Sequence, residues 1–265
     1  TNNTIKNVGL FDLTPFSKFE IKSDKAHQEL QKICTANIKN EPGKCVYTHM
    51  LNPDGGIETD LTVVCVDKNY FRIISSAATR ERDKFHIKKH LSKDIELKDI
   101  TDDLCVFGLF GPKSRDLLKT LSEDNFENDQ FRFGFAKFIA IDGVKIWTQR
   151  LSYVGELGYE LYVDLKDAKK IYELLIEKGK DFNLSNCGMH AMDIMRMESG
   201  FLHWGHDISP EENQFQAGLS FTISSKKEVD FIGKQALIKI KQEEQKSRFS
   251  MFTLKESEPG KPLLL

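Results

Sequence analysis

The sequence predicts an α+β protein with two ferredoxin-like lobes, each an antiparallel sheet backed by helices. Three observations support this prediction. The order strand, helix, three strands, helix occurs twice along the 265 residues. The two units open alike, with FEIKSDKAHQEL in the first and FGLFGPKSRDLL in the second. Each unit also contains a hairpin turn between strand-like runs, NPDGG at residues 52–56 and Asp142-Gly143 in the second unit.

The first unit begins with a strand over residues 16–21. Ser23 and Asp24 have side chains that commonly cap a helix, so a helix is expected over residues 26–34. The remaining elements expected in this unit are a hairpin within residues 44–66, a strand over residues 70–75 and a charged amphipathic helix over residues 80–91.

The second unit repeats this order. After a strand over residues 105–110, Gly111-Pro112-Lys113 opens a helix with the sequence SRDLLKTL. The remaining elements expected here are strands over residues 133–141, 144–150 and 155–163, and a helix over residues 168–179. Gly179 is expected to cap the end of that last helix, because glycine adopts left-handed backbone angles without strain.

The last part of the chain is less regular. A short helix over residues 191–199 is expected to end at Gly200, and the methionines in and beside it are expected to fill the core rather than contact a cofactor. These methionines are Met189, Met192, Met195 and Met197. A Lys/Glu-rich helix follows residues 231–234, and a strand is expected over residues 249–254.

Composition excludes several classes of function. The formal net charge of −2 provides no field that would recruit nucleic acid or an anionic membrane. The five cysteines include no C-x-x-C pair, which favours reduced thiols in a cytoplasm-like compartment. No apolar run approaches the roughly 18 residues that a membrane helix needs. We therefore expect a cytoplasmic protein, or a mitochondrial matrix protein if the source is a eukaryote.

Asp60 is an unusual residue for the middle of a strand. The period of two places Ile57, Leu61 and Val63 on one face of the second hairpin arm, with Asp60 and Glu58 on the other. Aspartate is depleted in strands because it packs poorly there. Periodicity alone leaves two interpretations open, a solvated sheet face and a functional acid.

Common cofactor motifs are absent from the sequence. Neither G-x-G-x-x-G nor G-x-x-x-x-G-K-[ST] occurs, and H-W-G-H-D at residues 203–207 fits no standard pattern of metal ligands, so no metal is expected. No G-x-S-x-G supports a serine hydrolase. The residues alone leave six isolated candidates, of which Arg196 can also pair with Asp193 on its own helix. These candidates are Asp60, Tyr153, Glu156, Glu160, Arg196 and Trp204.

Six segments, in order along nearly the whole chain, link these candidates. They are GLFDLTPFSKFEI, GKCVYTHMLNPDGGIETDLTV, GPKSRDLL, RLSYVGELGYELYV, RMESGFLHWGHDI and DFIGKQAL. Together they resemble the folate-binding aminomethyltransferase family, which includes the T-protein of the glycine cleavage system and the folate domains of dimethylglycine and sarcosine dehydrogenases. The wording Tyr-Val-Gly-Glu-Leu-Gly-Tyr-Glu and the pair Trp204-Gly205 look closer to the dehydrogenase branch. The K-G-C-x-G-Q-E motif of the branch implicated in iron-sulfur cluster maturation is missing.

The resemblance implies a tetrahydrofolate site and assigns roles to the candidates. Asp60 matches the family's catalytic aspartate, and Glu160 matches the acid that accepts hydrogen bonds from the pterin. Glu156, expected on the same strand face, is the rival for that second role. The other residues implied to contact folate are Tyr153, Arg196 and Trp204.

The resemblance also implies a domain division. The first lobe, residues 15–100, carries Asp60. The second lobe, residues 1–14 and 101–236, carries the pterin-binding acid. Residues 237–265 are expected to form a linker helix and the beginning of a truncated C-terminal β-barrel. No FAD site is expected in this chain.

The implied activity is tetrahydrofolate-dependent one-carbon transfer. In the leading interpretation, an iminium or formaldehyde-level carbon from a methylated amine such as dimethylglycine or sarcosine becomes the methylene group of 5,10-methylenetetrahydrofolate. The expected partner is a flavoprotein dehydrogenase domain or subunit. Two alternatives remain open: a glycine cleavage aminomethyltransferase that works with a lipoylated carrier protein, and a non-catalytic folate-binding regulatory subunit.

Overall fold

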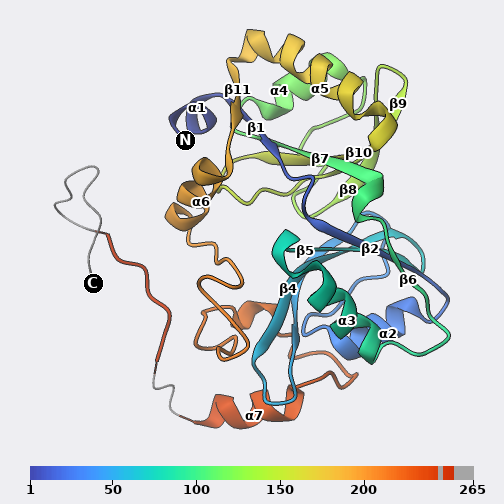
Figure 1. Cartoon of the computed structure of the whole chain (residues 1–265), viewed down its shortest axis with the longest axis vertical. Coiled ribbons are helices and arrows are strands. Elements are labelled where there is room, and N and C mark those ends of the chain that lie inside the picture. The colour runs from blue at the N-terminus through green and yellow to red at the C-terminus, as the bar shows by residue number, and fades with distance from the viewer. Residues whose placement is uncertain (244–246, 254–265) are drawn as a thin grey trace.

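The computed structural model describes residues 1–243 and 247–253. Its strands form two sheets, one above the other in Figure 1. The five-stranded sheet has the order β3 (Cys45–Leu51), β4 (Ile57–Asp67), β5 (Tyr70–Ser75), β2 (Ser17–Lys22) and β6 (Leu97–Asp99). The six-stranded sheet has the order β11 (Leu184–Cys187), β1 (Val8–Asp12), β7 (Leu104–Phe110), β10 (Gly158–Asp164), β9 (Val144–Gln149) and β8 (Ala136–Ile141).

Helices cover the outer faces of both sheets (Figure 1). The helices that precede β7 are α1 (Asn2–Lys6), α2 (Ala26–Ile33) and α3 (Arg80–His90). Those that follow β7 are α4 (Ser114–Leu121), α5 (Leu165–Gly179), α6 (Met189–Glu198) and α7 (Lys234–Gln242). Short 3₁₀ turns occur at Ala77–Thr79, Thr101–Asp103, Lys180–Phe182 and Ser220–Thr222.

The two sheets repeat one topology. In the first sheet, the strand that opens the unit, β2, lies between β5 and β6. In the second, the corresponding strand β7 lies next to β10, and β1 is inserted between β7 and the last strand β11. Neighbouring strands are antiparallel except for the pair β1 and β11. The predicted α+β class with two sheets is therefore confirmed.

Both predicted hairpins form, because their turn residues supply the backbone angles that a tight turn requires. Asp142 and Gly143 both have positive φ, as a two-residue hairpin turn needs. In the first hairpin Gly55 has φ +90°. The amide oxygen of Asn52 accepts hydrogen bonds from the backbone N–H groups of Asp54 and Gly56, which closes that turn.

Several expected boundaries were wrong. β10 begins at Gly158 rather than at residue 155. Gly179 remains helical with φ −63° and does not end α5 in a left-handed conformation. Its lack of a side chain instead makes room for Leu184, whose Cβ would lie 2.6 Å from an added Cβ. Helix α2 has no side-chain cap, although the Ser23 hydroxyl accepts a hydrogen bond from the Lys25 amide.

Two expectations near the C-terminus also need correction. The strand expected over residues 249–254 does not form over residues 249–253, and Leu254 lies outside the described residues. Only part of the expected barrel segment is described. Met192 and Met195 are buried as expected, whereas Met189 and Met197 are exposed because they lie on the outer side of α6.

All five cysteines are free thiols, and Cys34, Cys45 and Cys65 are buried. Within residues 1–243 and 247–253 no helix has the length and apolar character that a bilayer crossing requires.

Candidate functional site

The inner faces of the two sheets pack against each other and form a seam. Val64 and Ile74 of the first sheet share one hydrophobic cluster with Val106 and Tyr162 of the second. The Arg72 guanidinium of β5 also lies 5.9 Å from the centre of the Tyr162 ring. Side chains two residues apart on a strand share a face, so every second residue of β4 and β10 points into this seam.

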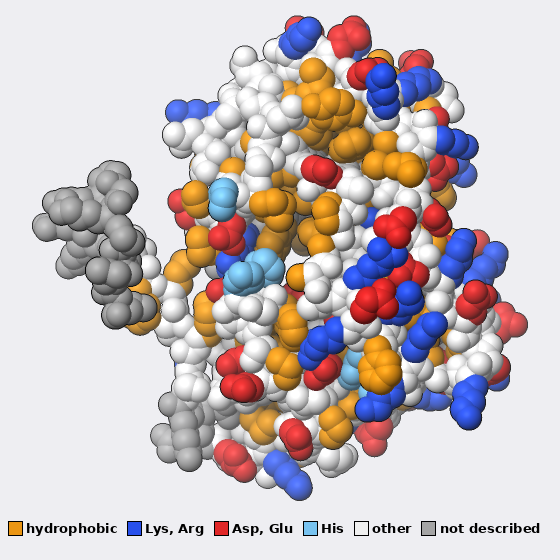
Figure 2. Space-filling model, in the orientation of Figure 1, with side chains coloured by type: hydrophobic (Ala, Val, Ile, Leu, Met, Phe, Trp, Pro, Cys, Tyr) orange, Lys and Arg blue, Asp and Glu red, His pale blue; other side chains and the backbone are white. Residues whose placement is uncertain are grey.

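Asp60 and Glu160 both lie on these inner faces. Asp60 shares the face of Val64 on β4, and Glu160 shares the face of Tyr162 on β10. Figure 2 shows a hollow near the middle of one face of the molecule, at the level where the two sheets of Figure 1 meet. The fold therefore places two acids that are far apart in the sequence on the inner faces of different sheets.

Asp60 has an environment that disfavours its charge. The residue is half-buried. Burial and the nearby carboxylate of Asp83 raise the pKa of Asp60 to about 6, against a hydrogen bond from the Tyr47 hydroxyl that lowers it. That bond spans 3.4 Å from Tyr47 Oη to Asp60 Oδ2. Raised carboxyl pKa values are typical of functional sites.

Behind Asp60, Tyr47 rests on a buried histidine that the sequence analysis missed. The Tyr47 hydroxyl lies 3.3 Å from His49 Nε2. His49 Nδ1 lies 3.0 Å from both Thr222 Oγ1 and Gln214 Nε2. Burial lowers the pKa of His49 to about 3, so its imidazole is neutral. The signal in the sequence is only the spacing of two between Tyr47 and His49, which places both on the face of Asp60.

Glu160 is buried between two contrasting neighbours. In the ladder it lies opposite Gly108 of β7 on one side and Gln149 of β9 on the other. The Tyr162 hydroxyl donates a hydrogen bond of 2.9 Å to Glu160 Oε2. Burial nevertheless raises the pKa of Glu160 to about 7. Glu156 does not share this strand face as expected, because it lies in the loop before β10 begins.

Tyr153 and Arg196 hold the loop that follows α6. Tyr153 Oη donates a hydrogen bond of 2.6 Å to the Leu202 carbonyl, and burial raises the pKa of Tyr153. Arg196 pairs with Asp193 at 2.7 Å, as its spacing predicts, and also with Asp207. Its guanidinium is therefore already paired with two carboxylates.

Trp204 fixes the same loop to the first hairpin. Its indole N–H donates a hydrogen bond of 2.9 Å to the Ile57 carbonyl, at the start of β4. The Arg82 guanidinium lies 4.3 Å from the centre of the indole ring. Close contact is also built in at Gly56, where an added Cβ would lie 1.8 Å from the Pro210 carbonyl oxygen. The loop is thus attached to β4 at Ile57, three residues before Asp60.

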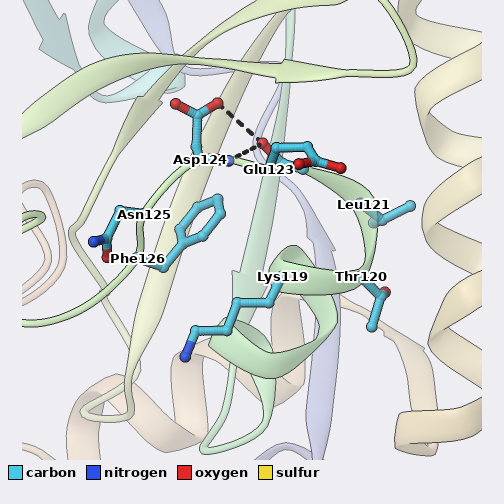
Figure 3. Close-up of a pocket in the computed structure, with 8 residues that line it drawn as sticks. Lys119, Thr120, Leu121, Glu123, Asp124, Asn125 and Phe126 are labelled. Carbon is cyan, nitrogen blue, oxygen red and sulfur yellow. Dashed lines mark hydrogen bonds between the residues drawn. The ribbon is translucent and has the colours of Figure 1, made fainter.

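Other parts of the surface offer less chemistry. A hollow lined by residues 119–126 lies at the end of α4, where the Ser122 hydroxyl donates to Asp124 at 3.0 Å (Figure 3). Leu121 and Phe126 pack into the core on the outer face of the six-stranded sheet, so this hollow is remote from the seam. In the described parts of the chain, no three His, Cys, Asp or Glu side chains are grouped to hold a metal.

The inner face around Glu160 suits a polar ring. Four buried atoms there lack a hydrogen-bond partner among the described residues, and they come from both sheets. They are Gln149 Oε1, Gln149 Nε2, Trp147 Nε1 and Arg72 Nη1. Because buried polar groups are normally paired, such a cluster fits a ligand with both donors and acceptors, as a pterin has.

Comparisons with known proteins identify the family of this chain. Residues 1–227 match the GCVT N-terminal domain. The chain is 38% identical over 236 residues to the 4-methylaminobutanoate oxidase (formaldehyde-forming) of Paenarthrobacter nicotinovorans, covering 89% of this chain and 29% of the oxidase. It is 34% identical over 253 residues to the mitochondrial dimethylglycine dehydrogenase of Rattus norvegicus, covering 94% of this chain and 29% of the dehydrogenase. The chain thus spans less than a third of the length of these relatives.

A solved structure shares the fold. The glycine cleavage system aminomethyltransferase T from Bartonella henselae superposes with a TM-score of 0.80, covering 91% of this chain and 65% of that chain at 21% identity. At this identity the likeness concerns the fold alone. The domain match, however, extends over most of the chain. The chain therefore belongs to the GCVT N-terminal domain family, which confirms the family that its sequence motifs indicate.

Proposed function

We propose that this chain binds tetrahydrofolate and uses it to capture a one-carbon unit released from a methylated amine. The observation that carries the proposal is the placement of Asp60 and Glu160 on facing inner sides of two sheets, each with a raised pKa. The names of two relatives, a formaldehyde-forming oxidase and a dimethylglycine dehydrogenase, support amine-derived carbon as the substrate.

Glu160 is the proposed pterin-binding acid. A pterin ring presents two adjacent N–H donors on one edge, and a carboxylate accepts both in parallel hydrogen bonds. The Tyr162 hydroxyl already occupies one site on Oε2, which fixes the orientation of the carboxylate. Glu156, half-buried in the loop before β10, remains the rival for this role.

Asp60 is the proposed catalytic base. Tetrahydrofolate, when bound, supplies two nitrogens that share the transferred carbon. The Asp60 carboxylate stabilises the cationic one-carbon unit and accepts the proton released from a nitrogen as the second C–N bond closes. Such general base catalysis contributes about 10² to 10⁴ in rate. Tyr47, which donates to Asp60 Oδ2, keeps the carboxylate available as the anion.

The remaining candidates shape the pocket. We propose that Tyr153 and Trp204 border the folate, since both anchor the loop next to Asp60. Arg196, already paired with Asp193 and Asp207, acts by holding that loop in place.

The proposed activity needs an amine-oxidising partner, for which we propose a flavoprotein domain or subunit. We also propose that residues 15–100 form one ferredoxin-like lobe and that residues 1–14 and 101–236 form the other. A cytoplasmic or mitochondrial location would suit this chemistry, and one relative carries the description mitochondrial.

A glycine cleavage aminomethyltransferase is the second candidate. It is favoured by the 34% identity over 238 residues to a protein named aminomethyltransferase in Alkaliphilus metalliredigens, which covers 89% of this chain and 64% of that protein. The two candidates differ in their products. An aminomethyltransferase would take the carbon from a lipoylated carrier protein and release ammonia. Capture from a methylated amine requires no carrier protein and releases no ammonia.

The test is calorimetric titration with tetrahydrofolate, followed by an assay of 5,10-methylenetetrahydrofolate formation from formaldehyde. We expect Glu160→Ala to abolish binding, and Asp60→Asn to bind normally but turn over at least a hundred times more slowly. Asp181→Asn, a change at an exposed acid, should behave as wild type. Undiminished turnover by Asp60→Asn, or no binding by the wild-type chain, would overturn the proposal.

A further inference from the structure

Gln149 is a buried amide without a partner. The residue is 0% exposed, and neither its Oε1 nor its Nε2 has a hydrogen-bond partner among the described residues. Folded proteins pair nearly all such groups, because an unpaired buried amide loses its hydrogen bonds to water and gains none in return. The position therefore suits a group that this chain alone does not supply.

The location of Gln149 indicates which group that is. Gln149 lies directly opposite Glu160 in the β9 and β10 ladder, so both side chains point into the seam, with Cβ atoms about 5 Å apart. On the other side of Glu160, Gly108 has no side chain, and an added Cβ there would meet the Phe110 ring at 2.8 Å. Of the two residues that lie beside Glu160 in the sheet, only Gln149 therefore has a polar side chain.

Building on the proposed function, we propose that Gln149 is a specificity-determining residue of the tetrahydrofolate site, which donates its amide N–H to the ring carbonyl. The pterin edge presents two N–H donors followed by a carbonyl acceptor. The Glu160 carboxylate accepts the two N–H groups, and the Gln149 amide, one strand away, donates to the oxygen. Carboxylate and amide together then read three consecutive groups on one ring edge.

This role predicts effects of opposite sign on stability and on binding. Gln149→Met removes an unpaired buried amide and fills the same space, so the ligand-free protein should melt at a higher temperature. The same variant loses one hydrogen bond to the ligand, so the dissociation constant for tetrahydrofolate should rise about 3- to 10-fold.

Thr148 provides a matched control on the same strand. Its hydroxyl is also buried and unpaired, but it points to the outer face of the sheet, opposite Leu161. Thr148→Val should therefore raise the melting temperature without changing affinity. If Gln149→Met fails to fold, Gln149→Asn keeps the amide and shortens its reach, and it should weaken binding by a similar factor.

The experiment is calorimetric titration of wild type, Gln149→Met, Thr148→Val and Glu160→Ala with tetrahydrofolate, with melting curves of each ligand-free protein. Weaker binding by Gln149→Met alongside unchanged binding by Thr148→Val supports the inference. If Glu160→Ala loses binding but Gln149→Met stays within twofold of wild type, the role of Gln149 is overturned while the proposed function stands. If the wild type does not bind, both are overturned.

Discussion

Replacing Asp60 with asparagine should make the protein more stable at neutral pH while removing its activity. Burial and Asp83 raise the pKa of Asp60 from 3.8 to about 6 in the folded state. The unfolded chain therefore gives up this proton at a lower pH than the folded protein does. The free-energy cost of Asp60 to the folded state is therefore absent well below pH 4, grows as the pH rises towards 6, and is constant above about pH 7.

The pKa difference sets the size of the effect. The difference between the folded and unfolded pKa of Asp60 destabilises the folded protein by about 3 kcal/mol at pH 8. At pH 5, where the folded carboxyl is still mostly protonated, the destabilisation is about 1.5 kcal/mol. These are upper values, because Asp60 is only partly buried and solvent screens part of the cost. The asparagine in Asp60→Asn carries no charge and does not bear this cost. The difference in free energy of unfolding between the variant and wild type should therefore roughly double between pH 5 and pH 8.

The measurement is urea unfolding of wild type and Asp60→Asn at both pH values. Other titrating groups are shared by the two proteins and cancel in the comparison. Asp181→Asn, at an exposed acid, should give the same difference from wild type at both pH values. Tyr47→Phe removes the bond that favours the charged carboxylate, so it should lose more stability at pH 8 than at pH 5. An Asp60→Asn gain that is equal at both pH values, or a loss at pH 8, would refute this account of Asp60.

Three further predictions test the binding acid Glu160 and the contacts between the first hairpin and the loop over residues 201–212. Because burial raises the pKa of Glu160 to about 7 and the ionised form accepts the pterin, calorimetry should find affinity for tetrahydrofolate about tenfold weaker at pH 6 than at pH 8; equal affinities would exclude Glu160 as the acceptor. Gly56→Ala should cost about 2 kcal/mol or more in urea unfolding, since its Cβ would meet the Pro210 carbonyl, whereas Gly188→Ala, with open space around it, should cost little. Trp204→Phe should leave the loop over residues 201–212 slightly more sensitive to protease and Trp204→Ala much more so, and equal cleavage of both variants would assign the anchoring to the indole N–H alone.

Local signals in the sequence predicted the hairpins well. The Asp142-Gly143 turn forms because both residues adopt the positive φ that the turn requires. The strand β1 was missed because four of its five residues are buried, so it lacks the alternation that marks a strand with one exposed face. The strand β11 was missed because it is short and largely exposed, and it exists through its parallel pairing with β1.

The site was harder to predict than the fold. Periodicity placed Asp60 on a polar face but did not distinguish a solvated face from a functional acid. What decides this is the packing of two sheets that are distant in sequence, and only the family resemblance linked Asp60 to Glu160. The bond from Gln214 to His49 joins residues 165 positions apart, and no local pattern marks it. Gln149 was likewise invisible, because its importance depends on which strand lies beside it.

The strand β1 has a consequence for how the chain is made. Within this sequence β1 precedes the other strands of both sheets, and its partners β7 and β11 are translated only after all five strands of the first sheet. During that interval the four residues of Val8–Asp12 that are buried in the folded protein lack the neighbouring strands that cover them. Until β7 and β11 have been synthesised, Val8–Asp12 is therefore an unpaired and largely apolar strand, and such segments are prone to aggregate during folding.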